Sequence, residues 1–131
     1  MLDTIKKIFE LSKKRINFLH NVDNKWWYFW HKTYIEWLKE ELEEVKQEIK
    51  ESNSVYLEDE LWDIFWDYIC LLHSLEEEKM INRDKVFERC YKKYIERLWT
   101  SAEFKQVNWQ ETKKKQKEEL KKEHDLMYNN K

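Results

Sequence analysis

Apolar residues recur along most of the chain at alternating spacings of three and four, which is the pattern of amphipathic α-helices. Two long stripes show it most clearly, one over residues 30–49 and one over residues 57–75. Between the periodic stretches, Asn, Ser and Asp interrupt the pattern and mark the expected helix ends, because these side chains cap helices. We therefore predict five helices, over residues 4–20, 25–50, 55–78, 83–99 and 109–128. Asn108 and Glu111, spaced as in a capping box, support the start of the last one.

The sequence has 131 residues and contains no glycine and no proline. Glycine supplies the left-handed backbone of tight hairpin turns, P-loops and dinucleotide-binding loops, so β-sandwiches, Walker-type NTPases and Rossmann enzymes are excluded. The composition is 41% hydrophobic and includes eight Trp, which is enough bulky apolar volume for a core. We expect an all-α fold with a single domain over residues 1–131. Its architecture should be an antiparallel helical bundle of about four core helices plus a C-terminal helix.

The charges are nearly balanced, with 25 Lys and Arg against 27 Asp and Glu, so the net charge of −2 indicates no class of partner. No uncharged run exceeds eight residues, whereas a membrane span needs about twenty. The N-terminus lacks the architecture of a signal peptide, and we expect a cytoplasmic protein without a membrane segment. Cys70 and Cys90 fit neither a disulfide framework nor a zinc-binding spacing, so both are interpreted as thiols of the core.

Each of the two central helices carries a row of acidic residues along the border of its apolar stripe, where solvated charges are not usually found. The rows consist of Glu41, Glu44 and Glu48 on the earlier helix and of Glu60, Asp63 and Asp67 on the later one. Asp67 interrupts an otherwise apolar run over residues 64–72. A carboxylate at this position is costly unless it is paired or coordinated.

The short turn around Ser52 makes these helices antiparallel neighbours, and it brings the acidic rows together. Glu44 and Glu60 are equally far from Ser52, and so are Glu41 and Asp63, so the two acidic pairs should face each other across the hairpin. Four carboxylates in one place repel one another and need a counter-charge. Ligation by carboxylate oxygens alone suits Mg²⁺ or Mn²⁺ and argues against zinc or copper.

The acidic rows contain a motif that is characteristic of one enzyme family. The segment EELEE at residues 40–44 is followed, after fifteen residues, by ELWD at residues 60–63. Further along, KYIER occupies residues 93–97 and WQETK occupies residues 109–113. In this order the segments resemble the EExxE…ExxD, K-x-x-x-R and W-x-x-x-K elements of the MazG-like, all-α nucleoside triphosphate pyrophosphohydrolases, which include the dimeric dUTPases.

The resemblance implies a reaction and a set of acidic site residues. The expected reaction is hydrolysis of an NTP or dNTP between the α and β phosphates, which gives the monophosphate and pyrophosphate. Mg²⁺ or Mn²⁺ would be the cofactor, and the role would be house-cleaning of the nucleotide pool. The residues that match the family's metal ligands are Glu41, Glu44, Glu60 and Asp63, with Asp67 as an additional candidate. Glu40 and Glu41 are the catalytic candidates, with Glu40 as an outer ligand or as the group that orients the attacking water.

Matching residues on the last two helices imply contacts with the substrate. Lys93, Arg97 and Lys113 correspond to the residues that clamp the phosphates, Arg through bidentate contacts and Lys as a point charge. Trp109 is expected either to touch the base or to anchor the last helix. The sequence departs from the family at Trp62, which stands where Gly is usual, and in the short segment before Trp109, which lacks the His-Pro-rich stretch of the bacterial housekeeping member.

Six consecutive residues, from Trp26 to His31, carry no charge and cannot all face one core on a helix. We favour a subunit contact for this stretch, because the family assembles as homodimers or homotetramers and aromatic surfaces are typical of interface cores. A stacking slot for the nucleotide base is the alternative.

Two other interpretations of the sequence stay open. The acidic rows can be an ordinary solvated face, with Lys39 and Lys46 as partners, in a non-catalytic helical adaptor protein. The lysine-rich stretch over residues 113–122 can also contact nucleic acid. However, Glu118 and Glu119 offer these lysines ion-pair partners, and the stretch lacks interleaved aromatic residues. We therefore do not expect a nucleic-acid partner.

Overall fold

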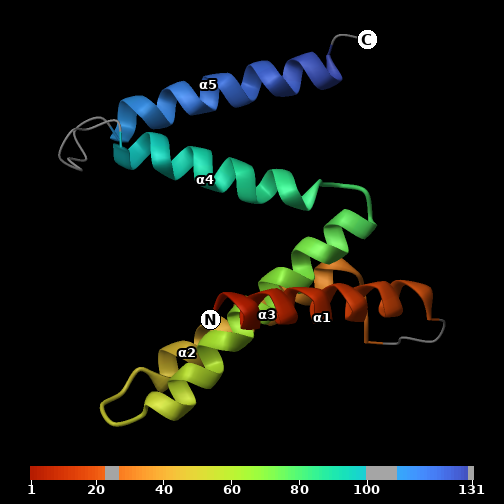
Figure 1. The fold of residues 1–131 in the computed structure, drawn as a ribbon, viewed down its shortest axis with the longest axis vertical. Coiled ribbons are helices and arrows are strands. Elements are labelled where there is room, and N and C mark those ends of the chain that lie inside the picture. The colour runs from red at the N-terminus through yellow and green to blue at the C-terminus, as the bar shows by residue number, and fades with distance from the viewer. Residues whose placement is uncertain (23–26, 100–108, 130–131) are drawn as a thin grey trace. The chain divides into compact units, whose positions relative to one another are not determined.

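The computed structural model describes residues 1–22, 27–99 and 109–129 (Figure 1). Within these ranges the chain forms five α-helices and no strand, which confirms the predicted all-α fold. The helices are α1 (Leu2–Asn21), α2 (His31–Glu48), α3 (Ser54–Glu77), α4 (Arg83–Trp99) and α5 (Trp109–Tyr128). In the described ranges no helix is long and apolar enough to cross a membrane. The chain divides into two compact units, Met1–Arg83 and Asp84–Lys131.

The helix ends agree with the predicted ones except at the start of α2. The bounds of α4 and α5 are as predicted, and those of α1 and α3 differ from the predictions by at most two residues. The proposed capping residue Asn108 lies outside the described residues, as do Trp26 and the predicted break over residues 100–108. The apolar period, together with the Asn, Ser and Asp residues that interrupt it, was therefore enough to locate most helix ends.

The prediction that α2 begins at residue 25 is wrong, because the helix begins at His31. Trp30 has a φ of 60°, which no helical residue adopts. The chain leaves the helical path where Tyr28 enters the core, with only 5% of its surface exposed. The Thr33 hydroxyl accepts a hydrogen bond from the backbone N–H of Phe29 at 2.7 Å, which ties the preceding segment to the first turn of α2. The burial of the Tyr28 ring therefore sets the start of α2. The spacing of apolar residues in the sequence does not reveal this burial.

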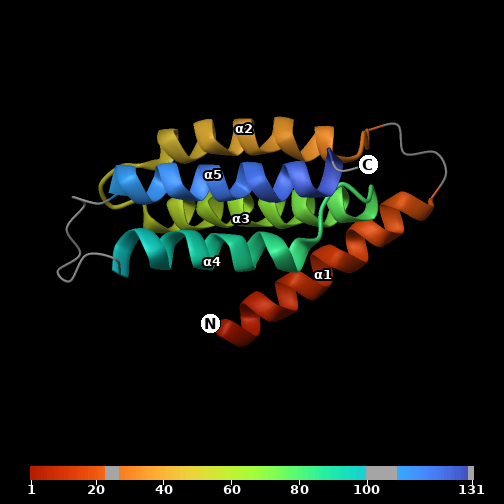
Figure 2. The same ribbon diagram turned by 90° about the horizontal axis from the view of Figure 1, so that it is seen from above.

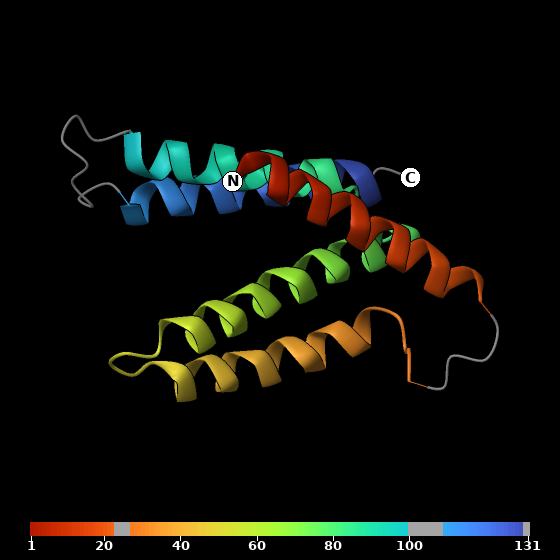
Figure 3. The ribbon, with the colours of Figure 1, turned by 60° about the horizontal axis from the view of Figure 1, so that its bottom comes forward.

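In the first unit, α2 and α3 form an antiparallel hairpin around Ser52 (Figures 2 and 3). Ser52 takes a φ of 53°, the left-handed conformation for which glycine is the usual residue. The Asn53 side-chain amide donates a hydrogen bond to the backbone O of Glu48 at 2.8 Å, which ties the turn to the end of α2. The predicted pairing of α2 with α3 is confirmed, and it brings their acidic borders together.

The core of the first unit lies where α1 and the segment before α2 meet α3. Its buried side chains are Ile16, Leu19, Tyr28, Tyr34 and Cys70. Cys70 is fully buried, as predicted, whereas Cys90 is exposed on α4, so the prediction of a core thiol is wrong there. Cysteine is small enough to be accommodated at either kind of position, and the sequence pattern did not separate the two cases.

A buried histidine connects α1 to the C-terminal half of α3. His73 is 2% exposed, and its Nδ1 accepts a hydrogen bond from Arg83 Nη1 at 2.9 Å. An arginine can only donate, so Nε2 carries the ring proton and donates towards Ser12 Oγ, at 3.0 Å, and Phe9 O, at 3.2 Å. Burial lowers the pKa of His73 to about 4, with the charge of Arg83 adding to the shift. His73 is therefore neutral at pH 7.

This contact predicts an acid-sensitive packing of α1. The pKa of His73 is about 4 in the folded chain, below the ordinary value of 6.5. The unfolded chain thus binds more protons between these values, so stability that is present above pH 6.5 is lost as the pH falls towards 4. The loss should be at most about 3 kcal/mol. Urea unfolding from pH 4.5 to 7.5 should show it, and His73→Gln, which keeps one donor and one acceptor, should lack it. Equal pH dependence in both proteins would contradict this assignment.

Candidate functional site

Three carboxylates converge between α2 and α3. One oxygen each from Glu41 on α2 and from Glu60 and Asp63 on α3 lies within 4.8 Å of the other two. The spacing of three places Glu60 and Asp63 on one face of α3, and the hairpin register places Glu41 opposite them. We call these three residues the acidic trio. In the described part of the chain it is the one set of His, Cys, Asp or Glu side chains that converges in this way.

Two oxygens of the acidic trio have no hydrogen-bond donor. Glu41 Oε2 and Glu60 Oε2 are both buried from solvent and unsatisfied. The pKa of Glu41 is raised to about 7, mainly by burial and in part by the charges of Glu44 and Asp63. The pKa values of Glu60 and Asp63 are also raised, in both cases mainly by burial. A cation that binds oxygen ligands would satisfy the two unsatisfied oxygens and offset the repulsion among the three carboxylates. The acidic trio therefore fits such an ion.

Glu44, the fourth predicted ligand, lies beside the acidic trio but is not one of the three converging groups. Its side chain is exposed. The proximity of Glu44 contributes to the raised pKa values of both Glu41 and Glu60, in addition to burial. Glu44 therefore adds to the uncompensated negative charge at this place. The role of Glu44 as a ligand stays a prediction.

Asp67 and Glu40 extend the acidic surface away from the trio. Asp67 follows Asp63 by one helical turn, and it is only 5% exposed. Burial raises the pKa of Asp67 to about 6, and the charges of Asp63 and Glu40 add to the shift. Glu40 itself is exposed. Asp67 therefore lies one turn beyond Asp63 on α3, and its role as an additional ligand stays a prediction.

An aromatic pocket borders Glu40. It has a volume of about 390 Å³, and its lining consists of Trp27, Phe29, Lys32, Thr33, Glu36, Trp37 and Glu40. The rings of Trp27 and Trp37 stack with centroids 5.7 Å apart and an interplanar angle of 13°. Part of the uncharged aromatic stretch therefore forms a concave surface beside the acidic residues, which suits a flat, partly polar ligand.

The bulky Trp62, which stands at the family's glycine position, packs along α3. Its ring stacks on Phe65 with centroids 4.9 Å apart and an interplanar angle of 6°, and the side chain is 44% exposed. The neighbouring carboxylates of Glu60 and Asp63 still converge with Glu41. The substitution therefore leaves the acidic trio in place.

The second unit is a hairpin of α4 and α5 that carries the predicted substrate-binding residues (Figure 1). The guanidinium carbon of Arg97 lies 5.0 Å from the ring centroid of Trp109, and Trp109 is also near Tyr94, at 6.3 Å between centroids. Lys93 is one turn before Arg97, and the partly buried Lys113 is one turn after Trp109. Trp109 therefore anchors the start of α5 to α4, which is one of the two roles expected for it.

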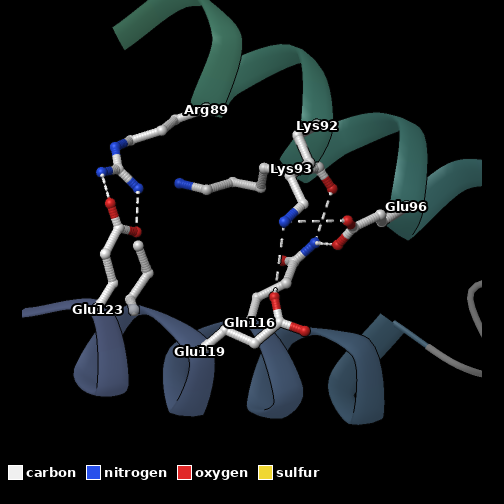
Figure 4. A pocket seen from close by; sticks show the side chains of 8 residues that line it. Arg89, Lys92, Lys93, Glu96, Gln116, Glu119 and Glu123 are labelled. Atoms are coloured by element: carbon white, nitrogen blue, oxygen red, sulfur yellow. Dashed lines mark hydrogen bonds and ion pairs between the residues drawn. The ribbon is translucent and has the colours of Figure 1, made fainter. Parts of the chain in front are cut away.

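A small pocket of about 130 Å³ lies between α4 and α5 (Figure 4). Arg89 and Glu123 close one end with a bidentate ion pair, at 2.9 and 2.6 Å. At the other end the buried side chain of Gln116 donates hydrogen bonds to Lys93 O and Glu96 Oε2. The sequence analysis missed Gln116. It follows Trp109 by seven residues, which places both on one face of α5, so the signal was available.

Comparison with known proteins agrees with this arrangement. The family model described as the MazG nucleotide pyrophosphohydrolase domain matches residues 29–99. The match covers more than half of the chain and includes the acidic trio, Lys93 and Arg97, whereas Trp109 lies beyond it. Searches of curated proteins and of solved structures gave no match. The chain therefore belongs to the MazG nucleotide pyrophosphohydrolase domain family.

Proposed function

We propose that the protein hydrolyses nucleoside or deoxynucleoside triphosphates between the α and β phosphates and releases the monophosphate and pyrophosphate. The observation that carries the proposal is the pair of buried, unsatisfied oxygens in the acidic trio, Glu41 Oε2 and Glu60 Oε2. They lie in the span matched by the family model. Carboxylates held without donors are suited to a hard cation, and Mg²⁺, or Mn²⁺ in its place, is the proposed cofactor.

The acidic trio would hold the cation, with Glu44 as a fourth ligand and Asp67 as a further candidate. When bound, Mg²⁺ offsets negative charge on the phosphates and makes water a better nucleophile. Glu40 is exposed at the edge of the trio, where its carboxylate can orient the attacking water and accept its proton. Because its pKa is raised, the carboxyl group of Asp67 can also hold a proton near the site, which supports a role for Asp67 there.

The basic side chains of the second unit would bind the phosphates. Arg97 offers a planar fork for two phosphate oxygens, whereas Lys93 and Lys113 act as point charges. The aromatic pocket beside Glu40 supports a nucleotide as the substrate, because its Trp27 and Trp37 rings provide an apolar site for a base.

We further propose that both units belong to one MazG-like domain that acts as a homodimer or homotetramer. The matched span runs across residue 83, where the two units meet in the sequence, which supports a single domain. Apolar side chains on α3 favour self-association, because Leu61 is 50% exposed and Trp62 is 44% exposed. In this proposal the enzyme cleans the nucleotide pool of the cytoplasm.

Turnover should be tested with a panel of the eight common NTPs and dNTPs, together with dUTP and oxidised nucleotides, in the presence of Mg²⁺. We expect pyrophosphate and a monophosphate from at least one of them, because cleavage lies between the α and β phosphates. Release of inorganic phosphate and a diphosphate would contradict the bond assignment. No turnover of any nucleotide, together with no Mg²⁺ binding by calorimetry, would refute the enzyme and favour the adaptor interpretation.

Glu41→Gln and Asp63→Asn should each weaken Mg²⁺ binding and turnover by at least about 100-fold, because each removes a ligand charge. The same changes should leave the metal-free protein as stable as the wild type or more stable, because they relieve repulsion. Calorimetry and thermal melting with and without Mg²⁺ measure both effects. Glu43→Gln is the matched control, since Glu43 is exposed on the same helix and pairs with Lys46. Wild-type Mg²⁺ affinity in Glu41→Gln would rule out the proposed ligand set.

Light scattering at micromolar concentration should give the mass of two or four chains. Trp62→Lys should lower this mass, because it places a charge on the exposed apolar face of α3. A monomer in the wild type would contradict the proposed assembly.

A further inference from the structure

A single side-chain amide of α5 joins three groups of α4. Gln116 is 8% exposed, and its Oε1 accepts a hydrogen bond from Arg97 Nε at 2.9 Å. Its Nε2 donates to the backbone O of Lys93 at 3.1 Å and to Glu96 Oε2 at 2.8 Å (Figure 4). Both N–H groups and the oxygen of the amide are therefore used. A buried amide with this set of partners has one stable orientation, because any other leaves polar atoms unsatisfied.

These contacts fix the plane of the Arg97 guanidinium. Gln116 holds its Nε, and the ring of Trp109 lies 5.0 Å from its central carbon. Within the described residues, no hydrogen bond or ion pair engages the two terminal Nη groups of Arg97. The end of the guanidinium that can form two parallel hydrogen bonds is therefore left for an anion.

Gln116 also connects Arg97 with the carboxylate of Glu96. Glu96 precedes Arg97 on α4, and its Oε1 lies 3.8 Å from Lys92 Nζ. The amide accepts from Arg97 and donates to Glu96, so it satisfies both charged groups without a direct ion pair between them. Without the Gln116 amide, the guanidinium of Arg97 would be free to turn towards Glu96. Its Nη groups would then form an ion pair within the protein and would not be available to an anion.

We propose that Gln116 is a positioning residue, which holds Arg97 in the orientation that binds the phosphates of the nucleotide. This inference rests on the proposed function, and it adds a residue that lies outside the family motifs. Gln116 need not touch the substrate, because it acts through Arg97.

Gln116→Met keeps the length of the side chain and removes all three hydrogen bonds. We expect about a tenfold rise in KM for the best nucleotide, the size of effect that follows from loss of a hydrogen bond to a charged group. The kcat should change much less, because the phosphate clamp acts on substrate and transition state alike. The Kd for inorganic pyrophosphate with Mg²⁺, measured by calorimetry, should rise by a similar factor. Gln110→Met, at an exposed position of the same helix, is the control and should match the wild type.

Two further variants separate positioning from simple packing. In an Arg97→Ala background, Gln116→Met should have no additional effect on KM or on pyrophosphate affinity, because the residue through which it acts is gone. Gln116→Glu keeps the size of the side chain, but it sets a carboxylate against Glu96 and against the backbone O of Lys93 and pairs it directly with Arg97. It should therefore raise KM as well, although the packing volume is unchanged.

A wild-type KM in Gln116→Met would overturn the inference. So would an undiminished effect of Gln116→Met in the Arg97→Ala background, or a wild-type KM in Gln116→Glu. A wild-type protein that neither turns over a nucleotide nor binds pyrophosphate would refute the proposed function itself, and this inference with it.

Discussion

Like charges that lie close together raise the free energy of a folded chain, and the acidic trio concentrates this cost where α2 packs on α3. Protons or a cation can neutralise the carboxylates, and burial raises the pKa of Glu41 to about 7. The buried side chains of the first unit, such as Ile16 and Tyr34, must supply the free energy that keeps the helices together despite this repulsion. The site is therefore a source of instability that the rest of the unit offsets.

The register that creates the trio is fixed at both ends of α2. At one end the turn around Ser52 joins it to α3. At the other end, His31 Nδ1 lies 2.7 Å from Glu78 Oε1, and the backbone N–H of His31 donates to Glu78 Oε2 at 3.2 Å. A slip by one residue would break these contacts and carry Glu41 away from Asp63. The two ends together hold three repelling carboxylates at one height.

A chain without glycine needs other residues in left-handed conformations. Trp30, Ser52 and Lys79 have φ values of 60°, 53° and 60°, each at a cost of about 1–3 kcal/mol. At Lys79, hydrogen bonds from Lys79 N to Glu76 O and from Met80 N to Leu75 O close the end of α3 and offset the strain. All three positions are helix ends next to the contacts that fix the register, so the strain lies where the fold needs a defined turn.

Much of this arrangement could be predicted from the sequence, because helix period and turn position set the height of residues in a hairpin. The convergence of Glu41 with Asp63 followed from their equal distance to Ser52. The start of α2 could not be predicted, because it depends on burial of Tyr28 against α1 and α3. Gln116 was overlooked although its spacing from Trp109 places it on the same face of α5, because glutamine is usually a surface residue and its three partners lie on another helix.

The absence of glycine also constrains how phosphate can be bound. P-loops use backbone N–H groups, which folding has already fixed, whereas the side chains of Arg and Lys lose about 2 kcal/mol of rotamer entropy when they are ordered. When this entropy is lost on binding, it weakens the complex with phosphate. When the side chain is already ordered in the folded protein, binding carries no such cost. The contact of Arg97 with the ring of Trp109 and its hydrogen bond to Gln116 order this side chain when the protein folds, so the entropy is lost before the phosphate binds. A helical phosphate site of this kind therefore needs supporting residues as much as it needs the basic groups themselves.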